Sequence, residues 1–206
     1  MNLLLRLTAV VLLFMAATSR SQGALHYIDF QNLIIPSNPD GIYVSPVTGA
    51  YMTAAPSDLN SAPWINFFFG GTAIGTTTFI KPVITSPATG NGDGLVLKVL
   101  ALQEIGPALH YAAGDNGSEN HTGSGSGQFQ SGVSGYLGFA MKATTSGPVT
   151  YGWMRITVNS NGSGIIHDSA YEDTPGTAIL AGAVPEPGQA VLMLVTAACL
   201  MFSRRR

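Results

Sequence analysis

The sequence predicts an all-β protein: an antiparallel two-sheet sandwich of jelly-roll-like type, with an N-terminal signal helix and a short C-terminal hydrophobic helix. Three observations lead to this class. Charged residues are only 10% of the 206 residues, well below the roughly 25% of average soluble domains, which argues against a helical bundle. Apolar segments between residues 24 and 183 are short and alternate with polar residues, as strands do. Glycine and proline gather between these segments, where turns are expected.

Nine strands are expected in the body of the chain. The segments between them, such as residues 38–41 and 146–148, are rich in residues that tolerate positive φ or fix a turn. Two sheets of such strands can bury one another's apolar faces without enclosing a ligand cavity. The expected strands cover residues 26–35, 41–47, 64–69, 76–84, 94–102, 135–143, 149–159, 165–171 and 179–183.

Alternation also predicts which side chains share a face, because successive side chains of a strand point to opposite sides. In the expected strand at residues 135–143, the large apolar side chains fall at every second position. These are Leu137, Phe139 and Met141. The glycine-rich segment of residues 114–132 has little to bury, so we expect one long loop there rather than a linker between two domains.

The strand at residues 149–158 carries the candidate ligand site. One of its faces is expected to hold Met154, Ile156 and Val158. Tyr151 and Trp153 fall on the other face together with Arg155 and Thr157, and these two polar residues favour an outward orientation. Tyr151 and Trp153 would then form a platform on which a glycan ring could stack. The alternative is that both rings belong to the core.

Residues 1–23 have the pattern of a secretory signal peptide. Arg6 is followed by an apolar run at residues 7–17 and then by small polar residues. The run is shorter than the roughly 20 residues that span a bilayer. Cleavage after Gly23 or after Ser19 would fit, and the sequence does not choose between them. The partners expected from this pattern are the Sec translocon and signal peptidase.

Residues 184–206 combine three linked features. Pro185, Glu186 and Pro187 are followed by an apolar run at residues 190–202, and then by Arg204, Arg205 and Arg206. Thirteen residues make about 20 Å of helix, short of the roughly 30 Å hydrocarbon core, so the run would be a poor permanent anchor. The arginines should stay cytoplasmic, which leaves residues 24–183 on the outer side, where the signal peptide also delivers them.

This arrangement resembles the PEP-CTERM sorting signal, a Pro-Glu-Pro motif followed by a short hydrophobic helix and a basic terminus. The resemblance implies processing by an exosortase, a membrane enzyme that removes or replaces the segment after the motif. It implies transient residence in the inner membrane, then a place in the cell envelope, on the outer surface or in the extracellular matrix. The second half of the body also resembles a recurrent PEP-CTERM body type, on residues 135–139, 151–153, 171–176 and 181–182.

Charge and cysteine content exclude several function classes. Between residues 24 and 183, four basic residues stand against ten acidic residues, a formal charge of −6. No basic face is available for phosphate backbones, so nucleic acid is not an expected partner. The single cysteine is Cys199, so the body can form neither a disulfide nor a thiolate site.

No catalytic or metal-binding motif is found. The body's glutamates, Glu104, Glu119 and Glu172, do not form the strand motif of a laminarinase-type glycosidase. The four histidines lack metal-ligand spacing, and we expect no metal and no other cofactor. Calcium is the one exception that the sequence leaves open, through residues 90–94 with Asp40 and Asp115.

The sequence therefore predicts an exported cell-surface or matrix protein of structural or adhesive type, and not an enzyme. A carbohydrate-binding module of the exopolysaccharide matrix is the alternative, and a glycosidase is the less favoured third reading. The partners expected are an exosortase, the membrane before processing and, in the alternative, extracellular polysaccharide.

Overall fold

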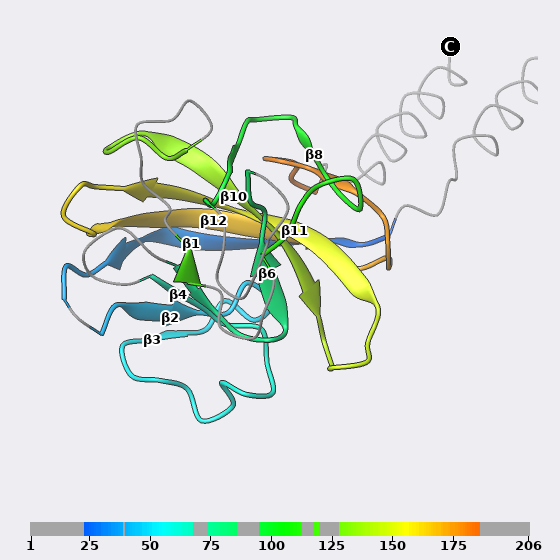
Figure 1. The fold of residues 1–206 in the computed structure, drawn as a ribbon, viewed down its shortest axis with the longest axis horizontal. Helices are drawn as coiled ribbons and strands as arrows, with labels where there is room; N and C mark the ends of the chain where they lie inside the picture. Colours follow the sequence, from blue (N-terminus) through cyan, green and yellow to red (C-terminus); the bar gives the residue numbers. More distant parts are fainter. Residues whose placement is uncertain are drawn as a thin grey trace, which may run out of the picture.

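The computed structural model describes residues 23–38, 40–67, 74–85, 95–112, 118–119 and 128–185 (Figure 1). In these ranges the chain forms thirteen strands and no helix, and every strand pairing is antiparallel. The predicted all-β antiparallel class is confirmed. The two terminal helices that the sequence predicts fall outside the described residues.

The largest sheet has six strands, in the order β1-β12-β11-β10-β6, and its strand β10 also pairs with β7. Three long strands, β10, β11 and β12, follow one another as hairpins and lie side by side through the centre of the molecule (Figure 1). The bounds are β1 (Leu25–Ile35), β6 (Ile80–Pro82), β7 (Lys98–Val99), β10 (Ser134–Lys142), β11 (Val149–Val158) and β12 (Gly164–Glu172).

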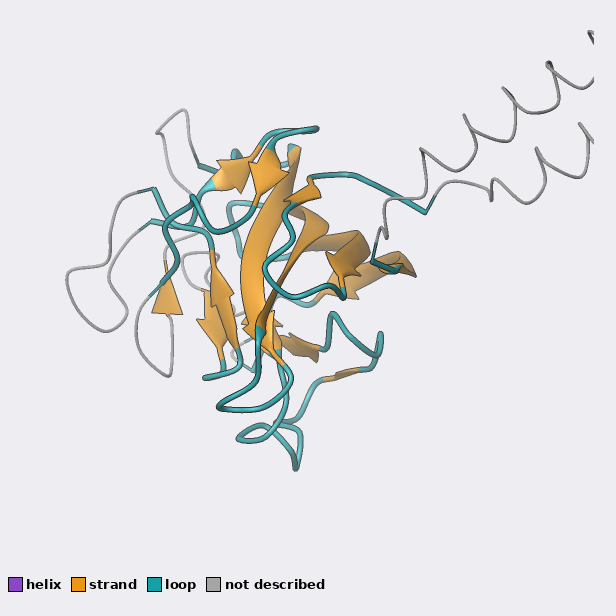
Figure 2. Ribbon diagram, turned by 90° about the vertical axis from the view of Figure 1, so that its right-hand side faces the viewer, coloured by secondary structure: helices purple, strands orange, loops and turns teal. Residues whose placement is uncertain are grey.

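Two smaller sheets consist of short strands (Figure 2). One has five strands, in the order β3-β2-β4-β5-β9, and the other is a ladder of β13 and β8. The bounds are β2 (Ile42–Val44), β3 (Tyr51–Met52), β4 (Ile65–Phe67), β5 (Ile74–Thr76), β8 (Glu104–Ile105), β9 (Ser118–Glu119) and β13 (Ile179–Leu180).

The larger of the two core clusters draws side chains from the six-stranded and the five-stranded sheet. All six apolar side chains that alternation placed on the inner faces of β10 and β11 belong to this cluster, so that prediction is confirmed. They are Leu137, Phe139, Met141, Met154, Ile156 and Val158. The five-stranded sheet contributes Ile42, Val44, Ile65, Phe67 and Ile74.

A glycine lets one phenylalanine ring of this cluster pack against the neighbouring strand. Phe139 on β10 pairs with Gly152 on β11. A Cβ added at Gly152 would collide with the Phe139 ring and would lie 2.7 Å from the carbonyl oxygen of Ala170. The residue opposite Phe139 therefore has to lack a side chain.

A second core cluster covers part of the opposite face of the six-stranded sheet. It contains Tyr151 and Trp153 from β11, together with residues of β7, β8 and β13. The exposed fractions of Tyr151 and Trp153 are 6% and 1%. Trp153 also meets the edge of the Tyr136 ring, with centroids 5.4 Å apart. The expectation that this face points outward is therefore wrong at Tyr151 and Trp153.

Each of the nine predicted ranges overlaps an observed strand, although most of the predicted ranges outside β1, β10, β11 and β12 are too long. The two-residue strands β3, β8 and β9 were not predicted, and of β5 the prediction included only Thr76. The expected loop at residues 114–132 is interrupted by β9 and by Phe129, whose side chain is fully buried in the larger core cluster. Phe129 is the one large apolar side chain of that segment, which explains why it returns to the core.

Candidate functional site

The outward face of the six-stranded sheet changes character where β1 and β12 become irregular. Asp29 of β1 pairs with Asp168 of β12, and the next pair is Leu33 with Ile166, so β1 holds two more residues than β12 in this interval. Gln31 and Asn32 lie there with φ of 52° and 62°. Both residues are outside the usual region for non-glycine residues, although asparagine tolerates it better than most. Bulges of this kind are common beside functional sites.

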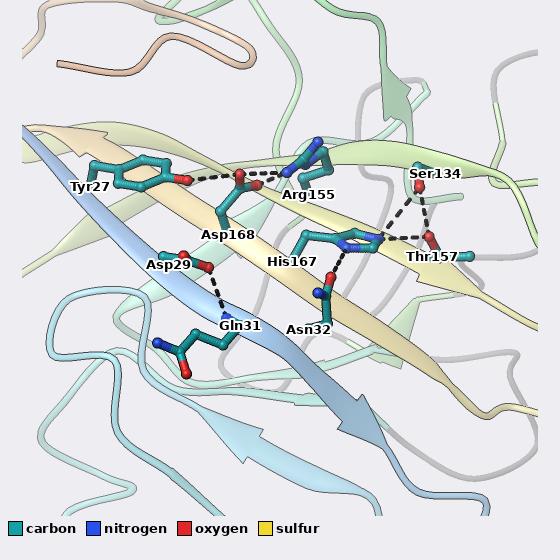
Figure 3. Close-up of polar contacts among 9 residues, drawn as sticks. All are labelled: Tyr27, Asp29, Gln31, Asn32, Ser134, Arg155, Thr157, His167 and Asp168. Carbon is teal, nitrogen blue, oxygen red and sulfur yellow. Dashed lines mark hydrogen bonds and ion pairs between the residues drawn. The ribbon is translucent and has the colours of Figure 1, made fainter. Parts of the chain in front are cut away.

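β12 has its own bulge at the same level. Arg155 of β11 pairs with Asp168, whereas the adjacent Ile156 pairs with Ile166, so His167 is an extra residue without a partner position on β11. A bulge redirects side chains. His167 and Asp168, although adjacent in sequence, both contact side chains of the outward face of β11 (Figure 3).

Arg155, Asp168 and Tyr27 form one half of the polar network at these bulges (Figure 3). Arg155 donates two hydrogen bonds to the Asp168 carboxylate, Nε to Oδ1 at 2.9 Å and Nη2 to Oδ2 at 2.7 Å. The Tyr27 hydroxyl donates to Oδ2 at 3.0 Å. The Asp168 side chain is 8% exposed and that of Arg155 43%, so the carboxylate is covered while the guanidinium reaches solvent. The hydrogen bond to Asp168 raises the pKa of Arg155.

Burial is the main cause that raises the pKa of Tyr27, and the hydrogen bond to the Asp168 carboxylate adds to it. Tyr27 therefore keeps its proton over the whole physiological range and remains a donor. Its ring is 38% exposed and lies 6.4 Å from that of Trp153, at an angle of 55°. Tyr27 is thus the aromatic side chain that connects the covered part of this face to the polar part.

His167 holds the other half of the network (Figure 3). Its Nδ1 lies 2.7 Å from Oδ1 of Asn32, and because a carbonyl oxygen only accepts, Nδ1 carries the proton. Nε2 therefore accepts from the Thr157 hydroxyl at 2.9 Å. The Ser134 hydroxyl lies 2.7 Å from Thr157 Oγ1 and 3.4 Å from Nε2. Burial first, and then the charge of Arg155, lower the pKa of His167, while Asp168 acts against them.

The network presents donors and acceptors side by side on an exposed or half-exposed sheet face. Ser134 supplies a hydroxyl and Asn32 an amide. His167 supplies an imidazole and Arg155 a guanidinium. The hydrogen-bonded chain from hydroxyl to imidazole to amide also has the order of groups found around a base-activated nucleophile. In this network the Thr157 hydroxyl contacts both Ser134 and His167. The arrangement suits the binding of a ligand with many hydroxyl groups.

The structure brings together a different set of residues from the predicted platform. Tyr151 and Trp153 are buried beneath β8 and β13 and are not available to stack on a sugar. Arg155 and Thr157 do lie on the outward side, as expected from their alternation with the inner residues. Of the sorting motif, Pro185 is described and exposed. The other predicted sorting residues lie outside the described ranges: Glu186, Pro187, Arg204, Arg205 and Arg206.

The calcium expectation falls largely on residues 90–94 and Asp115, which are outside the described ranges. Asp40 is described and exposed. Within the described part of the chain, no group of three or more His, Cys, Asp or Glu side chains is arranged to hold a metal ion.

Alternation alone missed the site, because it is built by two interruptions of the alternation. A shift of phase is nevertheless visible in the sequence. Before the bulge, the half-buried side chains of β1 are Ile28, beside Gly49, and Phe30, whereas after it Leu33 and Ile35 pack on the larger core cluster, so even positions give way to odd ones. Such a shift, with Asn32 inside it, is the signal that could have located the bulge.

No protein-family model matches this chain, and neither a curated protein nor a solved structure does. Across the described ranges, no helix has the length and apolar character needed to cross a membrane.

Proposed function

We propose that this chain is an exported protein of the cell surface or extracellular matrix with a structural or adhesive role, and that an exosortase sorts it through residues 184–206. The observation that carries this proposal is the sequence of that segment, in which Pro185, Glu186 and Pro187 precede a short apolar run and three arginines. The segment directly follows Ala183, which packs against the second core cluster. The motif thus comes within a few residues of a folded domain, where a membrane enzyme could reach it.

The architecture we propose for residues 24–183 is a jelly-roll-like sandwich of the two larger sheets. The larger core cluster supports it, because side chains of both sheets meet there. A protein built mainly to be displayed needs such a stable, self-contained domain.

The start of the domain supports a signal peptide that ends at Gly23. The backbone amide of Ala24 donates to Asp173 Oδ1 at 2.8 Å, and the amide of Asp173 lies 3.3 Å from the carbonyl oxygen of Ala24. Cleavage after Gly23 would convert that amide into a charged amino group beside a carboxylate. The same carboxylate lies 3.1 Å from Nε2 of His26. The new terminus would keep its place at the edge of β1.

The sorting role is tested by replacing Pro185, Glu186 and Pro187 with alanine in the full chain, expressed in a host that has an exosortase. We expect the variant to keep residues 188–206 and to stay in the inner-membrane fraction, whereas the natural chain loses them. Pro175→Ala is a matched control, because this exposed proline lies in a turn before β13. Equal processing of the triple variant and the natural chain would contradict the proposal.

A second candidate function, carbohydrate binding, is favoured by the polar network of Tyr27, Asn32, Ser134, Arg155, Thr157, His167 and Asp168. Hydroxyl groups of a glycan both donate and accept, and this network offers both on one face. Tyr27, rather than Tyr151 or Trp153, is the exposed ring beside it.

Asn32→Gly tests this second function and leaves the fold in place, because glycine adopts the observed positive φ without strain. The variant removes the amide that orients His167. We expect at least tenfold weaker retention on the producing cell's extracellular polysaccharide. Gln31→Gly is the matched control, with the same backbone conformation next to Asn32. Equal retention of both variants and the natural chain would remove the polar network from consideration as a glycan site.

A further inference from the structure

Four exposed apolar side chains lie around the ladder of β8 and β13. Leu100 and Leu102, before β8, are 63% and 73% exposed, and Leu180 and Val184, in and after β13, are 45% and 51% exposed. We call these four residues the apolar rim. They are four of the ten large apolar side chains that are exposed in the described ranges. Isolated exposed leucines are ordinary, whereas a group of them needs an explanation.

Backbone hydrogen bonds hold the parts of the apolar rim together. The amide of Gln103 donates to the carbonyl of Leu100 at 3.1 Å and closes a tight turn. Leu102 donates to Ala181 and Ala181 donates to Gln103, both at 2.9 Å, which extends the ladder from the Leu180–Glu104 pair into this turn. The apolar turn is therefore fixed to the strand that leads into residues 184–206.

Leu102 occupies the position of the turn that a leucine fits worst. Its φ is 64°, in the left-handed region that favours glycine and is costly for a bulky side chain. Its side chain is also the most exposed of the large apolar ones. Folding gains little from a leucine that is both strained and exposed, and such outliers cluster where a residue has a function.

The sequence after the rim indicates what covers it. Five residues separate Val184 from the apolar run that begins at Ala190, so the two Cα atoms lie at most about 22 Å apart even when the chain is fully extended. If that run enters a bilayer, the rim is the apolar surface of the described domain that is tied closest to it along the chain. In Figure 1, β8 and the orange strand β13 lie far from β3, on another side of the molecule.

We propose that the apolar rim contacts the lipid bilayer, with Leu100 and Leu102 inserted among the headgroups, and so holds the domain against the membrane surface before processing. This inference rests on the proposed function, because it requires residues 190–202 to be in the membrane. Glu104, opposite Leu180 in the ladder, is exposed. Its negative charge should make the contact favour zwitterionic over anionic lipid.

The test uses the full chain with Leu102→Trp, reconstituted into phosphatidylcholine vesicles with and without brominated acyl chains. The two natural tryptophans, Trp64 and Trp153, are 5% and 1% exposed, so their fluorescence is a constant background. Tyr51→Trp is the matched control, an aromatic replacement at a 58% exposed position of β3. We expect bromolipid to quench at least half of the additional emission of the Leu102 variant, and little of that of the control.

Each outcome decides the inference. Chains that float with the vesicles but show equal quenching at both positions overturn the bilayer contact alone. Chains that do not associate with vesicles overturn both this contact and the membrane step of the proposed function. A blue shift of the Leu102→Trp emission that depends on protein concentration without lipid would show that a second copy covers the rim, and would also overturn it.

Leu102→Gly gives an independent measurement. Relief of the positive φ should raise the midpoint of thermal unfolding, whereas Leu100→Gly, at a residue without positive φ, should lower it. In vesicles that contain spin-labelled lipid, the label should broaden the NMR signals of the domain less in Leu102→Gly than in the natural chain. A stabilised variant with unchanged lipid contact would contradict the role of Leu102.

Discussion

At the scale of single residues, the polar network depends on which atoms carry protons. Asn32 fixes the proton of His167 on Nδ1, and this leaves Nε2 as an acceptor for Thr157. A positively charged His167 would lose that acceptor and would face Arg155, so the neutral form is the one that fits the fold.

The pH dependence of stability follows from this preference. The pKa of His167 is lower in the folded chain than the usual value of about 6.5, so below that pH the unfolded chain binds the proton more readily. The stability that neutral His167 contributes is fully present above about pH 6.5, and it is lost as the pH falls through the pKa of His167 in the folded chain. We expect the unfolding free energy, measured by urea titration, to fall less steeply over this range in His167→Gln than in the natural chain.

NMR titration of the imidazole nitrogens provides the direct check on the same residue. The natural chain should show His167 with its proton on Nδ1 and a pKa below 6.5. An Nε2 tautomer, or a pKa above the usual value, would contradict the geometry of the network. Asn32→Gly should release the tautomer preference while the fold persists, because the amide acceptor is gone.

At the scale of elements, the hairpin of β10 and β11 shows how a register selects residues. Gly152 faces Phe139, and a methyl group there would meet the ring and the carbonyl oxygen of Ala170. Both neighbours are fixed, one as a buried core ring and the other as backbone, so neither can move away at little cost.

Gly152→Ala should therefore destabilise the domain by about 1–3 kcal/mol, the usual cost of overpacking a core. Chemical denaturation monitored by tryptophan fluorescence measures this directly. Gly176→Asn is a suitable control, because no atom lies within 4 Å of an added Cβ and asparagine tolerates its φ of 73°. Equal stability of Gly152→Ala and the natural chain would show that this register is wrong.

The sequence predicted the parts of the fold in which apolar and polar side chains alternate without interruption. Alternation identified the buried faces of β10 and β11, because each of these strands keeps its phase over its inner residues. It could not predict β8, since a strand of two residues has no period. Without β8, nothing indicated that a second core cluster covers this face, and Tyr151 and Trp153 looked free to bind a ligand.

The candidate site was the least predictable part for a related reason. Its residues come from β1, β10, β11 and β12, and the two bulges add His167 and Asn32 to the face that Arg155, Thr157 and Asp168 share by regular pairing. Arg155 and Thr157 were placed outward correctly, but nothing local to them indicates contact with Asp168 or His167. Their partners depend on strand pairing over long sequence separations, which alternation does not encode.

At the scale of the whole molecule, the domain has apolar material on both faces of its largest sheet. One face packs on the five-stranded sheet, and part of the other is covered by β8 and β13. The remaining outward surface holds the polar network. The described domain thus has three distinct parts: the two core clusters, the polar network on the outward face, and the apolar rim around the ladder of β8 and β13.

The proposed processing at the two ends would not disturb the packing of the described domain. Ala24 is held by Asp173, just after the expected cleavage position, and Ala183 packs on the second cluster just before the sorting motif. Processing at both places would leave both core clusters intact, because all of their members lie between residues 25 and 183.

The most direct test of the central claim is the intact mass and terminal peptide map of the natural chain, purified from the envelope or matrix of a cell that has an exosortase. The account predicts a mature chain that starts at Ala24 and ends near Pro187. A mature protein that still contains Arg204, Arg205 and Arg206 would contradict the sorting role, and one that still contains residues 1–23 would contradict export through a signal peptide.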